Sequence, residues 1–419
     1  MFIRKYDSST GMRNAVTAPY KRLVINFHWL ICLICLVTIT GCLSPIALNR
    51  AVIAYDDAVT DVVSQQLLIN IVRAHHRQPI HFTGVSNIAA TFTFQASAGA
   101  APAAGGLAGS SILPIFGGSM AESPTISIVP IEGEDFTRRL LTPFPQSGLI
   151  LLLRQHFDVD LLLRMMAQEV RLQHKPYHSD TFRNKSTDKA GYEMFRRVVL
   201  HLSAIQDQNQ LYVEPLPLTH TWKIPAATIA PDSFQSLQKE FVVHYDSADD
   251  TFTLHKQILG PILITNYDPD TLSESERELL NERAREWDVS DVAFDIRAGY
   301  YGGEWPMVGI FRLRSFHSIL SFLSKALGNE TGYHVEKDPR TPPILNNENP
   351  DLTMELIQSN IAPSGVDFSI RWNNQFYAVN TTGPHARWNR DAFQLLFLLF
   401  QMTVTDIPRV GVPSITIAK

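Results

Sequence analysis

The sequence predicts an α+β fold: a long N-terminal amphipathic helix with a small-residue β-hairpin, followed by a mixed domain of antiparallel strands and helices. Three observations support this prediction. Apolar residues recur at spacings of three and four over residues 48–75, which is typical of an amphipathic helix. Residues 85–130 alternate with a period of two, as strands do. Residues 190–419 mix short helical and strand-like segments, an order typical of α+β proteins.

These patterns divide the chain into three parts. Residues 1–41 are interpreted as an export signal, 42–180 as an N-terminal helical region with the β-hairpin, and 190–419 as a C-terminal α+β domain. The polar, charged stretch 174–189 is expected to be the linker.

The predicted hairpin has an unusual composition. Its first strand is expected at Ile88–Ala98 and its second around Thr125–Ile128, with a flexible Ala/Gly/Ser-rich tract at Ala98–Ser111. No charged residue occurs between Thr91 and Ala121. Three interpretations stay open. The hairpin enters the outer membrane beside hairpins of other copies, presents a surface to a protein partner, or packs in an ordinary core.

The remaining elements follow from local signals. Glu134 and Asp135 are expected to open a short helix that ends before Pro143. The apolar run 149–172 is expected to form two helices. Later helices are predicted at 195–205, 273–287 with a capping box at Ser273 and Glu276, 315–327 and 392–402. Strands are predicted at 211–213, 222–224, 241–245, 251–255, 292–297, 368–370, 376–379 and 414–417.

The first 41 residues have the layout of an export signal. A mostly apolar run at 23–40 follows a segment that carries five basic side chains. Small Thr40 and Gly41 then precede Cys42, so we expect cleavage between Gly41 and Cys42. The alternative is an uncleaved helix in the inner membrane, for which the apolar run is at the short end of the ~20 residues required. A start at Met12 instead of Met1 also stays open.

The run Ile39-Thr40-Gly41-Cys42 resembles the lipobox of bacterial lipoproteins, with isoleucine in place of the commoner leucine. The resemblance implies a thioether diacylglycerol on Cys42 and a further acyl chain, such as palmitate, on the new N-terminus. Stable anchoring requires more than one acyl chain. Leu43 and Ser44 imply, by the sorting rule of that class, the periplasmic face of the outer membrane.

Cysteine and charge exclude several functions. Cys32 and Cys35 lie within the signal, so Cys42 would be the only cysteine of the mature chain and no internal disulfide could form. Cleavage would remove five of the 36 basic and one of the 41 acidic side chains, leaving 31 against 40 and a net charge of −9. That charge disfavours nucleic acid as a partner. The expected partners are the membrane, through the lipid on Cys42, and a second copy or another envelope protein.

Several segments of the chain share a recognisable pattern: residues 65–74, 78–80, 122–130, 136, 139–141, 143, 314–315, 319–323, 376–377, 391–396 and 413–417. Together they resemble a family of uncharacterised proteobacterial outer-membrane lipoproteins. They cover the mature chain from end to end, and the resemblance implies a lipoprotein without assigned activity. The family pattern has a tryptophan before Phe376-Tyr377 and an acidic residue shortly after, where this chain has Gln375 and Val379-Asn380.

No motif in the chain predicts catalysis. The sequence has no G-x-S-x-G elbow, no phosphate-binding loop and no H-E-x-x-H motif, so we expect no catalytic residue, no metal site and no cofactor. The predicted function is that of a membrane-anchored periplasmic lipoprotein acting as a non-catalytic structural or accessory component of a cell-envelope complex.

The alternative is a glycan- or ligand-binding or hydrolytic envelope protein. Its candidate site is a cleft at Tyr300, Tyr301 and Trp305, whose rings could stack on a sugar or peptide. A buried turn is the simpler interpretation of this stretch.

Overall fold

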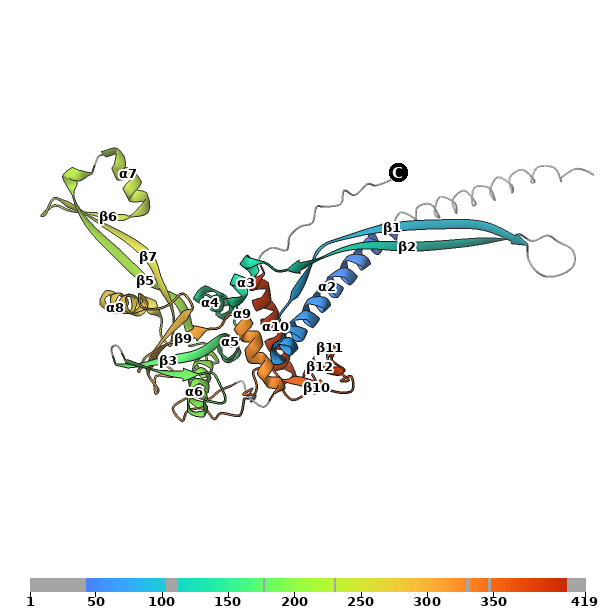
Figure 1. Ribbon diagram of the computed structural model, residues 1–419. Helices are drawn as coiled ribbons and strands as arrows, with labels where there is room; N and C mark the ends of the chain where they lie inside the picture. Colours follow the sequence, from blue (N-terminus) through green and yellow to red (C-terminus); the bar gives the residue numbers. More distant parts are fainter. Residues whose placement is uncertain are drawn as a thin grey trace, which may run out of the picture. The chain divides into compact units, whose positions relative to one another are not determined.

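The computed structural model describes residues 43–102, 112–175, 178–229, 231–328, 332–345 and 348–404 of the 419-residue chain. The fold in these ranges is α+β, as the sequence predicts, with nine α-helices and twelve strands in three sheets (Figure 1). The described residues fall into two compact units that divide between Val62 and Val63.

Helix α2 spans Leu43–His75 and crosses from the first unit into the second. In the first unit, Val52 and Ile53 are exposed. In the second unit, the helix buries Leu67, Ile71 and Val72 completely.

Strands β1 (Phe82–Pro102) and β2 (Ile112–Ile131) form an antiparallel two-stranded sheet. The pairing runs from Phe82↔Ile131 to Pro102↔Ile112, with one bulge between Val85 and Asn87. The predicted hairpin is therefore present, but its strands are longer than expected. The tract that begins at Ala98 was predicted to be flexible because of its Ala/Gly/Ser-rich composition, but Ala98 to Pro102 pair with residues 112–116.

The next segment contains α3 (Glu134–Leu141), α4 (Gln146–Arg154), α5 (Val159–Met166), β3 (Ala167–Lys175) and β4 (His178–Arg183). The short helix at 134–141 and two helices within the apolar run are confirmed. The prediction of helix for residues 167–172 was wrong, because these residues belong to β3. A short buried apolar segment has the same hydrophobic pattern in a helix and in a strand.

The end of β3 and all of β4 lie within the stretch 174–189 that was expected to be a linker. They belong to a seven-stranded sheet in the order β4-β3-β9-β8-β7-β5, with β6 paired to β7. One sheet thus combines strands from both sides of the predicted linker.

The other strands of that sheet follow later in the chain, with an α-helix before β5, before β6 and before β8. These strands are β5 (Tyr212–Pro225), β6 (Val242–Asp246), β7 (Thr251–Thr265), β8 (Asp291–Ile296) and β9 (Met307–Leu313). The helices between and after them are α6 (Lys189–Gln206), α7 (Pro231–Glu240), α8 (Glu274–Ala284), α9 (Phe316–Leu323) and α10 (Ala386–Thr403). Short 3₁₀ turns occupy Ala226–Thr228, Pro269–Thr271 and Ser324–Leu327. The β7–β8 pair is parallel and the other pairs of this sheet are antiparallel.

A third sheet has the order β10-β12-β11, built from β10 (Leu356–Ser359), β11 (Ser369–Trp372) and β12 (Gln375–Val379). Asn373 and Asn374 close the β11–β12 turn with φ angles of 46° and 65°, which asparagine tolerates better than most residues. The capping box at Ser273 and Glu276 is also present. The strand predicted at 414–417 lies outside the described residues.

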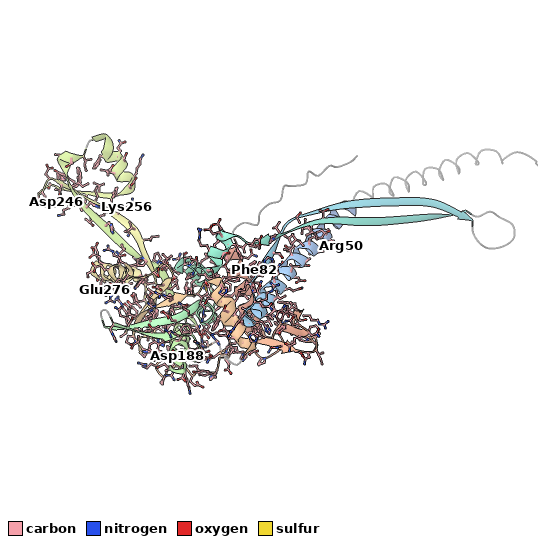
Figure 2. The ribbon with its side chains drawn as sticks, viewed as in Figure 1. Arg50, Phe82, Asp188, Asp246, Lys256 and Glu276 are labelled. Atoms are coloured by element: carbon pink, nitrogen blue, oxygen red, sulfur yellow. The ribbon has the colours of Figure 1, made fainter. Side chains whose placement is uncertain are left out.

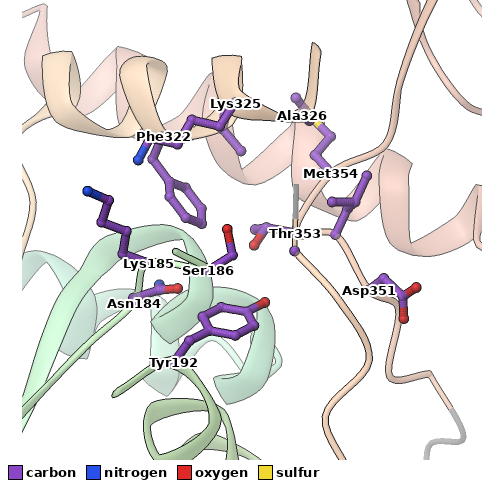
Figure 3. Close-up of a pocket in the computed structure, with 13 residues that line it drawn as sticks. Asn184, Lys185, Ser186, Tyr192, Phe322, Lys325, Ala326, Asp351, Thr353 and Met354 are labelled. Carbon is purple, nitrogen blue, oxygen red and sulfur yellow. The ribbon is translucent and has the colours of Figure 1, made fainter. Parts of the chain in front are cut away.

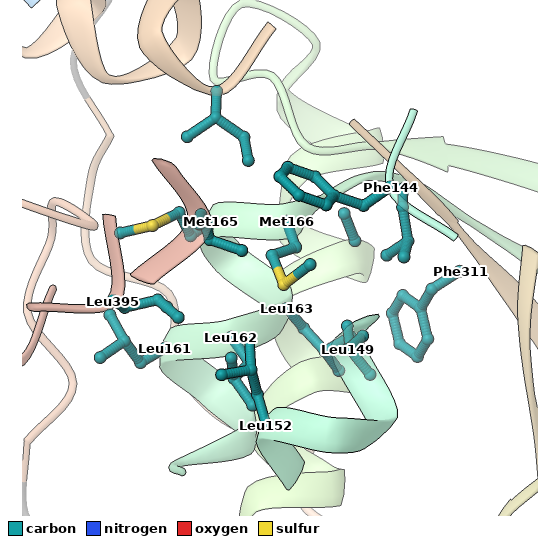
Figure 4. Packing of buried hydrophobic residues seen from close by; sticks show 14 of the residues in the cluster. Phe144, Leu149, Leu152, Leu161, Leu162, Leu163, Met165, Met166, Phe311 and Leu395 are labelled. Atoms are coloured by element: carbon teal, nitrogen blue, oxygen red, sulfur yellow. The ribbon is translucent and has the colours of Figure 1, made fainter. Parts of the chain in front are cut away.

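The main core lies around α5, which is buried along its whole length. Figure 4 shows its leucines and methionines packed beside residues of α4, β9 and α10. Phe82, at the start of β1 (labelled in Figure 2), belongs to the same core and contacts the Phe400 ring at 4.6 Å. The base of the hairpin is thus fixed in the core.

Three arginines and one carboxylate are buried beside α5. Arg314 Nη1 donates to the carbonyl oxygens of Arg164 (3.0 Å) and Met165 (2.9 Å), and its Nη2 donates to that of Asn184 (3.2 Å). Burial lowers the pKa of the Arg314 guanidinium to about 9, so it stays protonated at neutral pH.

The other two arginines flank the single buried acid of this cluster, Asp160. Arg196 Nη1 donates to Asp160 Oδ1, and Arg164 Nη1 lies 3.9 Å from Asp160 Oδ2. Arg164 Nη2 donates to the Pro350 carbonyl at 2.8 Å. Burial, and then repulsion from Arg196, lowers the pKa of Arg164 to about 10. The cluster therefore ties α5 to α6 and to the segment before β10.

Replacement of Arg314 by methionine should lower the free energy of unfolding by about 3 kcal/mol, because it removes three hydrogen bonds to buried carbonyl groups. Of these groups, the Arg164 carbonyl keeps a second donor, Asn184 Nδ2, at 2.9 Å. Arg138→Met is the control, since Arg138 pairs with Glu134 on an exposed helix surface; it should cost less than about 0.5 kcal/mol. Urea denaturation measures both, and equal effects would contradict the role given to Arg314.

Candidate functional site

The proposed lipidation residue, Cys42, and the preceding Gly41 lie outside the described residues. Within the described ranges, no helix combines the length and apolar character needed to cross a bilayer. The apolar run at 23–40 is not part of those ranges.

Two amide side chains of α2 bind the start of β1. Gln66 accepts from the Thr83 N–H at 2.7 Å and donates to the Thr83 carbonyl at 3.0 Å. Asn70 makes the same pair of bonds with His81, at 3.0 and 2.8 Å. Because residues four apart lie on one helix face and residues two apart point the same way along a strand, the two amides act together like a short neighbouring strand.

This arrangement fixes which backbone groups of the hairpin point outward, away from the partner strand. In an antiparallel pair, opposed residues alternate between pairs that exchange both hydrogen bonds and pairs whose N–H and C=O groups point outward. The Thr83 groups bind α2, so the Thr83↔Pro130 pair is an outward pair. Every second residue of β2 from Pro130 is then outward, which includes Pro124 and Pro114.

Those prolines make the two edges of the hairpin chemically different. Proline has no N–H and is confined in sheets to positions where that group would point outward, as the register places all three. The β2 edge therefore lacks donors at Pro114, Pro124 and Pro130. The opposed outward positions of β1, from the bulge to its end at Pro102, carry no other proline: Ile88, Ala90, Phe92, Phe94, Ala96, Ala98 and Ala100.

The second candidate is the turn that carries Tyr300, Tyr301 and Trp305. Tyr300 is exposed and its ring lies 5.4 Å from that of Tyr267. Tyr301 is half-buried against the main core. Trp305 is buried, with the Arg340 guanidinium 4.6 Å from its ring centroid. The three rings are thus not brought together on one open surface.

His201 connects this turn to Thr341 through both nitrogens of its ring. Its Nε2 lies 2.8 Å from the Gly302 carbonyl oxygen, so it carries the proton, and its Nδ1 then accepts from the Thr341 hydroxyl at 3.1 Å. Burial lowers the pKa of His201, which favours its neutral ring. Gly302 has a φ of +75°, and a Cβ there would lie 2.6 Å from Ile205. These contacts define a close-packed structural turn.

A groove of about 550 Å³ lies between α8 and the strands β3, β4 and β9. Trp287, Ile310 and Leu279 supply apolar surface, and Arg171 and Arg283 lie with Glu282 and Glu286 along the same groove. This volume is within the range of about 300–1,000 Å³ typical of small-molecule sites. Its residues come from three distant stretches, 171–179, 279–287 and 308–310, so no local pattern in the sequence predicts this groove.

Figure 3 shows a smaller cavity of about 40 Å³, bordered by Asn184, Tyr192, Phe322 and Thr353. Its volume suits one or two water molecules rather than a ligand.

The histidines near the end of α2 contact aromatic rings. The His76 ring lies 4.8 Å from Trp372 and 5.0 Å from His75. Burial, and then the charge of His75, lowers the pKa of His76. Across the ranges that the structure describes, no three His, Cys, Asp or Glu side chains are grouped to hold a metal ion.

Comparison with known proteins gives no relative: no protein-family model, curated protein or solved structure matches the chain.

The burial of Trp305 and the exposure of Tyr300 predict different contributions of the two rings to stability. Trp305→Ala should lower the free energy of unfolding by about 3 kcal/mol, as removal of a buried aromatic ring does. Tyr300→Ala should cost less than about 1 kcal/mol, because that side chain is exposed. Urea denaturation of both variants tests this, and a Trp305 variant as stable as the parent would show that the ring is not a core residue.

Proposed function

We propose that this chain is a lipid-anchored, non-catalytic structural or accessory component of a cell-envelope complex. The observation that carries the proposal is the β1–β2 hairpin, whose strands of 21 and 20 residues form a sheet with no third strand in the described chain. Isolated two-stranded sheets are marginally stable in water, and open strand edges readily pair with other chains.

The anchor in this proposal is lipid on Cys42, and the location is the periplasmic face of the outer membrane. The lipobox-like run and the likeness to uncharacterised proteobacterial lipoproteins support it. The hairpin begins about 40 residues after Cys42 in the sequence. An uncleaved N-terminal helix in the inner membrane is the competing arrangement.

A second candidate function is ligand binding or hydrolysis in the envelope. The groove beneath α8 favours binding, because it combines the half-buried Trp287 with both signs of charge. It is a better candidate site than the Tyr300–Trp305 turn, where the tryptophan ring is covered.

Lipidation is tested by growth with an alkyne analogue of palmitate. The Cys42→Ala variant should carry at least tenfold less label than the parent protein, because the sulfur is the first site of acylation. Cys32→Ser, within the signal, is the control and should keep it. Mass spectrometry of the labelled protein should find Cys42 at its N-terminus. A peptide that contains the intact Gly41–Cys42 bond would instead establish the uncleaved helix.

The structural role is tested by shortening the hairpin. Ala89 and Thr125 are directly opposed, so a two-residue Asn-Gly turn can replace residues 90–124 and close the ladder. The base of the hairpin and its bonds to Gln66 and Asn70 stay intact. The variant should fold and carry lipid as before, but should lose the larger assembly on native gels of solubilised membranes. An assembly of unchanged size would contradict the proposed function.

A further inference from the structure

The two edges of the β1–β2 hairpin differ in what they can bind. The β2 edge lacks three donors and carries Glu122 at an outward position, and proline and charge are the features that protect strand edges from pairing. The β1 edge from Ile88 to Ala100 has neither. At about 3.4 Å per residue, this unprotected edge extends for about 40 Å.

We propose that the β1 edge pairs antiparallel with the β1 edge of a second copy of this chain, giving a sheet in the order β2-β1-β1-β2. This inference rests on the proposed structural role and names the partner of the hairpin.

The β1 edge requires a strand as its partner. Its outward N–H and C=O groups recur at every second residue, a spacing that another extended strand satisfies along its full length. At the base of the hairpin, Gln66 and Asn70 already satisfy the groups of Thr83 and His81. Pairing with another strand would therefore begin beyond the bulge and continue to Pro102.

A second copy meets this requirement without charge repulsion, because β1 has no charged residue. Two copies held in the same membrane would also meet at a high effective concentration. The pairing is symmetric, so each β1 contributes the same residues as its partner. It leaves only the two proline-bearing β2 edges outermost, and the assembly therefore stops at a dimer instead of growing into a chain of hairpins.

Cysteine scanning tests the pairing in the full chain, in solubilised membranes. Single cysteines replace residues 91–98 of β1 and the opposed residues 116–123 of β2 in turn, in a Cys32→Ser, Cys35→Ser background. Two copies of one β1 position face each other only near the two-fold axis. Disulfide-linked dimers should therefore form at one β1 position or two adjacent ones, at least tenfold above every β2 position.

Ala96 and Gly118 provide matched proline variants, because they are opposed in the register and both are outward. Neither Ala96→Pro nor Gly118→Pro removes a hydrogen bond between β1 and β2. Ala96→Pro removes a donor from the proposed interface and should reduce the dimer yield of the best cysteine variant at least tenfold. Gly118→Pro should leave that yield within about twofold.

Dimers from β2 cysteines, equal losses from the two proline variants, or no dimer at any β1 position would each overturn the inference. The shortened hairpin separates it from the proposed function. If shortening disperses a larger assembly while no β1 cysteine forms a dimer, the structural role stands and self-pairing fails. If β1 cysteines form dimers but shortening leaves the assembly unchanged, self-pairing stands and the proposed role of the hairpin fails.

Discussion

The position of Arg314 determines how the main sheet and the helical core meet. The carbonyl groups in the last turn of a helix have no partner within the helix, and α5 ends in the core, where water cannot supply one. Arg314 binds two of those carbonyls through its side chain and that of Met166 through its own N–H, at 2.6 Å. The chain can therefore pass directly from α5 into β3. Because Arg314 follows β9, the same contacts set the register of β3 on β9.

The base of the hairpin packs in that core. Phe82 and Ile131 are opposed in the register and both belong to the main hydrophobic cluster. Gln66 and Asn70 then satisfy the outward backbone groups of Thr83 in β1 and of His81 just before it. The hairpin therefore combines a base that is fixed in the core with a long strand edge. An element proposed to bind a partner requires both.

Elements that depend on neighbouring residues were predictable. The Ser273 capping box, the Asn373-Asn374 turn and the break at Pro143 each follow from local backbone chemistry. The start of β3 was not, because it depends on Arg314, about 150 residues away in the sequence. The existence of the hairpin was predictable from its alternation. The even spacing of Pro114, Pro124 and Pro130 shows from the sequence that all three prolines lie on the same edge of the strand. Only the bonds between Thr83 and α2 show that this is the outward edge.

The same three prolines have a consequence for folding of the hairpin itself. Strands rich in alanine and glycine specify their alignment weakly, and a slip by one residue exchanges every inward and outward group. Such a slip would place Pro114, Pro124 and Pro130 where the ladder needs donors, at a cost of about 1 kcal/mol for each lost bond. The prolines thus discriminate against misaligned hairpins, and they supply a specificity that the small side chains of this segment cannot.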